Sequence, residues 1–157
     1  MSEPRPKTLT MEMKTAAARE VAAELQRSKL IPDDFGEDAI KDIAENGTLY
    51  GDGYSLARAL EDHRGWECDL QIAEALDSFS SHAQDELKNA QKAWAERNNI
   101  QPPLPNGTRV KLPSDETGVI DDVYGYGVAQ FKIDGDKDAK PPHNARRIVY
   151  FEDAVAL

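Results

Sequence analysis

Residues 119–136, VIDDVYGYGVAQFKIDGD, contain two runs typical of β-strands, separated by a segment with two Tyr-Gly pairs. In the second run, alternate residues from Ala129 to Ile133 are apolar. A period of two is expected for a strand with one buried face. Gly125 and Gly127 permit the positive φ angles of a tight turn. The stretch therefore predicts a β-hairpin.

The same period extends over the last third of the chain. Besides residues 127–133, strands are expected at residues 108–112, 118–124, 146–150 and 152–157. Four or five short strands within about fifty residues predict a small, strongly bent barrel.

The segments GTRVKL, ETGVIDDVY, GVAQFKID and RRIVYFEDAVAL together resemble the SH3-like barrels of the KOW and Tudor kind. The residues that carry the likeness are Gly107, Val110, Gly118, Val119, Ile120 and Val123. The resemblance covers the last third of the chain, and no family is recognised for residues 1–100. It implies a barrel that binds protein or nucleic acid and performs no chemistry.

Upstream of this region the period of the apolar residues changes to about 3.6. The change falls at residues 101–107, QPPLPNG, whose three prolines predict a stiff linker. Helices are expected at residues 8–30, 33–47 and 54–65. Residues 1–7 are expected to be a disordered lead. The chain is thus predicted to be α+β, with a helical bundle in residues 1–100, the linker, and an SH3-like barrel in residues 108–157.

The fourth predicted helix is the longest. It is expected to begin near Asp69, a good N-cap residue, and to end near Asn98. Apolar residues recur at steps of three and four for about six turns. This stripe consists of Ile72, Leu76, Phe79, Ala83, Leu87, Ala90 and Trp94. One continuous helix is therefore predicted as the spine of the bundle.

The chain is acidic, with a net charge of −10 over 157 residues. Residues 1–105 carry 12 Lys/Arg and 20 Asp/Glu, and residues 106–157 carry 7 and 9. Non-specific nucleic-acid binding requires excess positive charge, so it is not expected. The single cysteine, Cys68, and the absence of a long apolar run predict a soluble cytoplasmic protein without membrane contact.

No catalytic, cofactor or metal site is predicted. The three histidines are widely separated, and Glu61-Asp62 beside His63 has the pattern of an exposed helix end. The aspartates of residues 134–139 alternate as in a calcium loop, but the glycine and glutamate that such a loop needs are both replaced by alanine. Cys68 lacks the signs of a nucleophile. An enzyme is therefore not expected.

The leading prediction is a non-enzymatic protein that binds another protein. Tyr124 and Tyr126 flank a glycine on the expected hairpin and form the candidate partner-binding surface, with Arg146 and Arg147 as expected neighbours across the sheet. Trp66 is a further candidate, or else it joins two helices. The alternative is a phage or mobile-element inhibitor whose carboxylates mimic nucleic-acid phosphates and block a host machine.

Overall fold

The computed structural model describes residues 3–143 and 145–157 and confirms the α+β class. The chain divides into two compact units. The helical unit is Pro6–Ala90, and the half-barrel unit consists of Gln91–Leu157 together with the described residues up to Arg5. No helix in the described part of the chain is both long and apolar enough to cross a membrane.

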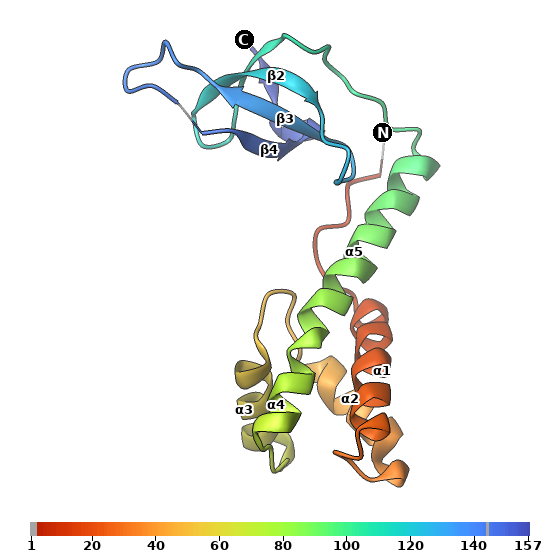
Figure 1. Ribbon diagram of the computed structural model, residues 1–157. Coiled ribbons are helices and arrows are strands. Elements are labelled where there is room, and N and C mark those ends of the chain that lie inside the picture. Colours follow the sequence, from red (N-terminus) through yellow and green to blue (C-terminus); the bar gives the residue numbers. More distant parts are fainter. Residues whose placement is uncertain (1–2, 144) are drawn as a thin grey trace. The chain divides into compact units, whose positions relative to one another are not determined.

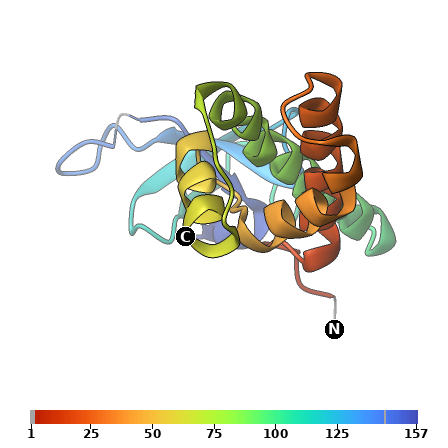
Figure 2. The same ribbon diagram turned by 90° about the horizontal axis from the view of Figure 1, so that it is seen from below.

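The helical unit contains four complete α-helices among its described residues and the first part of a fifth (Figure 1). They are α1 (Met11–Arg27), α2 (Gly36–Asn46), α3 (Gly53–Arg64), α4 (Leu70–Leu76) and α5 (Ser78–Arg97), with a short 3-10 helix, η1 (Asp33–Phe35), before α2. Seen from below, α1 and α2 are close neighbours (Figure 2).

Polar side chains begin three of these helices. The side-chain oxygens of Thr10, Asp52 and Asp69 accept hydrogen bonds from backbone N–H groups in the first turns of α1, α3 and α4. Such caps satisfy N–H groups that have no partner inside the helix. At the other end of α3, Gly65 takes the left-handed conformation with φ of 71° and ends the helix.

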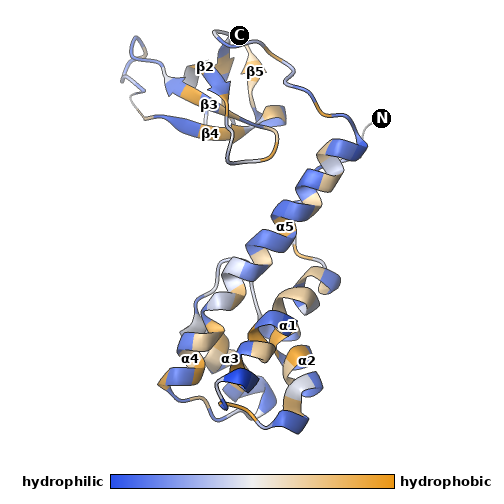
Figure 3. Cartoon of the chain, turned by 45° about the vertical axis from the view of Figure 1, so that its right-hand side comes forward, coloured by the Kyte–Doolittle hydropathy of each residue, from blue (hydrophilic) through white to orange (hydrophobic). Residues whose placement is uncertain are grey.

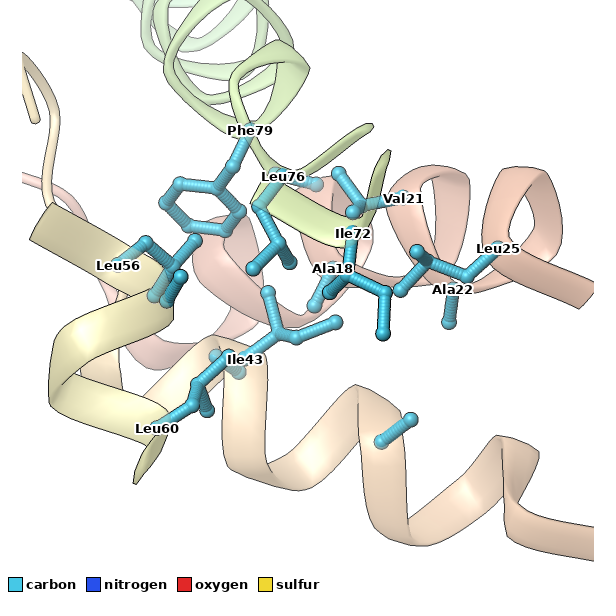
Figure 4. Close-up of a cluster of buried hydrophobic side chains, with 14 of the residues drawn as sticks. Ala18, Val21, Ala22, Leu25, Ile43, Leu56, Leu60, Ile72, Leu76 and Phe79 are labelled. Carbon is cyan, nitrogen blue, oxygen red and sulfur yellow. The ribbon is translucent and has the colours of Figure 1, made fainter. Parts of the chain in front are cut away.

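A single hydrophobic core fills the helical unit (Figure 4). Val21, Leu25, Ile43, Leu60 and Leu76 are among its most completely buried side chains. Colouring by hydropathy separates these inward faces from the hydrophilic outer faces of the helices (Figure 3). Alanines in α1 and α2 also lie in the core and let these two helices pack closely.

The predicted single helix from Asp69 to Asn98 is wrong, because α4 and α5 are separate helices with a break at Asp77. The N–H of Gly53, at the start of α3, donates a hydrogen bond of 2.8 Å to the Asp77 carboxylate. A Cβ atom at position 53 would overlap the carbonyl oxygen of Ala73 and lie 2.7 Å from the Asp77 nitrogen. The start of α3 thus packs directly against the backbone at the break between α4 and α5.

The predicted barrel is a five-stranded antiparallel half-barrel in the described residues. Its strands are β1 (Arg109–Lys111), β2 (Thr117–Val123), β3 (Gln130–Gly135), β4 (Arg147–Tyr150) and β5 (Val155–Ala156). Their order is β4-β3-β2-β1-β5, so β4 and β5 are the two edges. A register shift between Ile120 and Asp122 interrupts the pairing of β2 with β3. The strand expected from Glu152 onward is shorter, because residues 151–153 form a 3-10 helix, η2 (Phe151–Asp153).

The half-barrel has its own apolar core. Phe131 and Ile133 are buried as their alternation predicts, and the Phe131 and Phe151 rings lie 4.4 Å apart between centroids. Val110, Leu112, Ile120 and Ala154 complete the buried cluster. Ile100, directly before the proline-rich segment, and Leu104, within it, pack against this cluster. Through Leu104 the proline-rich segment takes part in the half-barrel unit.

Candidate functional site

The tyrosine hairpin, residues 124–129, connects β2 to β3. The N–H of Tyr124 donates to the Gln130 carbonyl at 2.7 Å and closes the hairpin. The Tyr124 and Tyr126 rings meet edge to face, with centroids 5.8 Å apart. Tyr126 is 83% exposed, whereas Tyr124 is half-buried. The structure therefore brings these two predicted site residues together.

The hairpin turns differently from the sequence prediction. Its left-handed residue is Ala129, with φ of 51°, and neither Gly125 nor Gly127 has a positive φ. Gly127 lies close to its neighbours, because a Cβ there would overlap the end of the Gln130 side chain, which would have to move, and would lie 2.9 Å from the Tyr124 ring. The expected role of glycine as the source of positive φ is thus wrong, and close packing of neighbouring side chains replaces it.

Arg146 and Arg147 lie at the other end of the β3–β4 pair. Gln130 of β3 is paired with Tyr150, next to the hairpin, whereas Ile133 is paired with Arg147. Three residues of a strand span about 10 Å. The strand pairing therefore brings Tyr150 to the tyrosine hairpin and leaves the two arginines away from it.

Both arginines are engaged with carboxylates. Arg146 lies 3.0 Å from Asp134, and Arg147 lies 3.1 Å from Glu116. The hydrogen bond from Arg147 is the main cause of a lowered Glu116 pKa. These are exposed pairs, which contribute little to stability.

Trp66 belongs to the helical unit and is half-buried. Its indole N–H donates to the Asp42 carboxylate in α2 at 2.9 Å, and its ring lies 5.4 Å from that of Phe35. It packs against the helical core. These contacts join the segment after α3 to α2 and η1.

Arg5 forms a site that the sequence prediction missed. Its guanidinium donates to Glu152 at 2.6 and 3.2 Å, to the Val128 carbonyl at 2.7 Å and to the Ala129 carbonyl at 2.8 Å. The Arg5 side chain is 1% exposed. It lies in the segment predicted to be disordered, whose residues 1 and 2 are outside the described residues. Hydrogen bonds from this buried guanidinium hold Arg5 in place, which local sequence reasoning did not anticipate.

Two aromatic rings complete the environment of Arg5. Its guanidinium carbon lies 4.1 Å from the centroid of the Tyr150 ring and 4.7 Å from that of Trp94. Cations are attracted to the faces of aromatic rings at such distances. We call the arrangement of Trp94, Tyr150, Glu152 and the two carbonyls the arginine socket. No spacing pattern in the sequence connects these residues.

A groove runs beside the edge strand β4. It has a volume of about 560 Å³ and is lined by residues of β4, by Gln130 and by the loop between β1 and β2, including Leu112 and Glu116. Ile148, which is 41% exposed, and Tyr150 give it apolar surface. An edge strand beside a groove suits an extended peptide segment.

In the loop that resembles a calcium site, residues 134–139, the carboxylate of Asp136 is engaged in hydrogen bonds within the protein. Asp136 accepts hydrogen bonds from the Thr117 hydroxyl at 2.9 Å and from the Asp138 N–H at 3.0 Å, and these lower its pKa. His143 accepts from the Thr117 N–H at 3.0 Å. Among the described residues, no group of three or more His, Cys, Asp or Glu side chains could hold a metal ion.

No family model, curated protein or solved structure matches this chain.

Cys68 is expected to react slowly with alkylating reagents. Desolvation, followed by the charges of Glu61 and Asp69, raises its thiol pKa from 9.0 to about 11. At pH 8 this lowers the reactive thiolate fraction about a hundredfold. The rate with iodoacetamide should be compared with that of a Cys68→Ser, Ser81→Cys variant, which carries an exposed thiol on α5. Equal rates in the two proteins would contradict this prediction.

Proposed function

We propose that the chain is a non-enzymatic, acidic binding protein that engages another protein through its half-barrel, which we assign to the SH3-like class. The strand order, the short η2 helix before the last strand and the small core support that assignment. The exposed Tyr126 ring, supported by Tyr124, is the observation that carries the proposed function.

Tyr126 has the properties of an interface anchor. Its body is apolar and its hydroxyl is polar, so the ring is favourable both in water and in a protein interface. The hairpin behind it is held at two points, by the Arg5 bonds to the Val128 and Ala129 carbonyls and by the Tyr124–Gln130 backbone bond. A surface fixed before binding loses less conformational entropy when the complex forms.

The charge arrangement favours protein binding over mimicry of nucleic acid. A mimic needs unpaired carboxylates gathered on one surface, in place of phosphates. In the half-barrel, arginines neutralise several carboxylates, namely Glu116, Asp121, Asp134 and Asp136. These four carboxylates are therefore paired with cations, which does not favour a role as phosphate mimics. We retain the protein-binding function and propose no catalysis or membrane contact.

Tyr126→Ala tests this function. Because the ring is exposed, the variant should change the free energy of unfolding by no more than about 0.5 kcal/mol. Capture of the partner should weaken by roughly 2 kcal/mol, or about thirtyfold, as for the loss of an interface anchor. The measurements are thermal unfolding and quantitative mass spectrometry of proteins captured from the native host.

Tyr50→Ala provides a matched control. Tyr50 is 82% exposed and lies in the helical unit, so the two substitutions remove similar exposed rings from different units. The proposal requires that Tyr50→Ala capture the same proteins as the wild type while Tyr126→Ala loses one of them. If both variants capture the wild-type set, the hairpin is only a turn, and Trp66 becomes the next residue to test.

A further inference from the structure

The arginine socket offers a hydrogen-bond acceptor to each of the three nitrogens of one guanidinium group. The carboxylate of Glu152 takes two donors, two backbone carbonyls take two more, and aromatic rings cover the planar cation. A lysine ammonium cannot reproduce this planar, forked pattern. The socket is therefore selective for arginine by its geometry.

The segment that occupies the socket is held like a bound peptide. Glu3 and Pro4 are exposed, and residues 3–7 form no helix or strand. Besides Arg5, a partly buried contact is made by the Glu3 carbonyl, which accepts from the Trp94 indole N–H at 2.7 Å. The Glu3 side chain reaches Arg97 at 2.7 Å, and both of these side chains are about half exposed. Among residues 3–7, Arg5 is the one buried residue, as is the anchor residue of a linear motif.

We propose that the socket is a binding site for an arginine in an extended segment of the protein partner, and that Arg5 fills this site in the chain itself. The inference rests on the proposed protein-binding function and deepens it by stating the chemistry of the partner. The socket adjoins the tyrosine hairpin, because Val128 and Ala129 supply its carbonyls. A partner that inserts an arginine there lies next to the hairpin that carries Tyr126.

Tethering makes Arg5 a strong competitor. A short flexible connection gives a group an effective concentration in the millimolar range. A partner must therefore add contacts outside the socket, and the hairpin and the β4 groove supply surfaces for them. A free peptide with a single arginine is expected to enter the socket only when Arg5 is removed.

The test uses the full chain with Trp66→Phe, which leaves Trp94 as the sole tryptophan and makes its fluorescence a report on the socket. The probe is the acetylated, amidated hexapeptide SEPRPK, residues 2–7 of the chain, and its matched control is SEPKPK. In the Arg5→Ala variant, SEPRPK should bind at least about tenfold more tightly than SEPKPK. It should also bind at least about tenfold more tightly to this variant than to the chain that retains Arg5.

Two results would overturn the proposal: equal binding of both peptides by Arg5→Ala, or binding of neither. If Arg5→Ala fails to fold, SEPRPK should restore a cooperative thermal transition where SEPKPK does not, and a lack of restoration refutes the site. The titration uses a peptide of stated sequence, so it is independent of the partner capture measured for Tyr126→Ala. Each of the two proposals can therefore be refuted by its own experiment, independently of the other.

Discussion

Phe131→Ala is expected to unfold the half-barrel while the helical unit stays folded. The Phe131 side chain is 0% exposed and packs against Phe151 in the centre of a small core. Replacing a buried phenylalanine by alanine costs about 3–5 kcal/mol, which is comparable to the whole stability of a domain of this size. The Phe131→Ala variant is therefore expected to keep its helices and to lose its sheet.

Two signals separate the units in this experiment. Far-UV circular dichroism at 222 nm follows the helices, and the NMR methyl resonances of Ile120 and Ile133 follow the half-barrel. Phe131→Leu is the graded control, because it retains apolar volume and should cause a smaller loss. If the helical signal disappears together with the methyl signals, the two units unfold as one, contrary to the two-part organisation.

Gly53→Ala is expected to destabilise the helical unit by about 3 kcal/mol. The new Cβ would overlap the Ala73 carbonyl and approach the Asp77 nitrogen, both of which are backbone atoms that side-chain rotation cannot move. The shift needed to relieve the overlap would also disturb the hydrogen bond from the Gly53 N–H to Asp77. Chemical denaturation followed at 222 nm measures the loss.

Gly65→Ala is the matched control for this substitution. Position 65 has open space around it but a φ of 71°, so alanine there meets only the backbone cost of a left-handed conformation, about 1–2 kcal/mol. Gly53→Ala should therefore be the more destabilising of the two. A loss at position 53 no greater than that at position 65 would show that α3 moves away from α4 easily.

The periodicity of the sequence predicted the fold class well because it reports which faces are buried. The change from a period of 3.6 to a period of two correctly placed helices before strands, and alternation correctly assigned Phe131 and Ile133 to a core. It could not find the break at Asp77, since the partner there is Gly53, from another helix. A stripe of apolar residues continues through such a break without a visible change.

The candidate site was predicted only in part. The pairing of Tyr124 with Tyr126 follows from their spacing, but the strand register, which separates them from Arg147, depends on pairing across the sheet. The socket was not predictable, because Arg5 lies in a polar, proline-flanked segment and its partners come from distant parts of the chain. Such contacts have no local periodicity to detect.

The bond between Arg5 and Glu152 joins residues 147 positions apart, which has a consequence for biosynthesis. At typical translation rates, roughly 7–30 s pass between the synthesis of these two residues. The helical unit, with its shorter-range contacts, can form during that interval, whereas the socket cannot exist before Glu152 has emerged from the ribosome. Arg5 is thus synthesised well before Glu152 and reaches its final place only after Glu152 has been made, and until then its guanidinium is open to ribosome-associated factors.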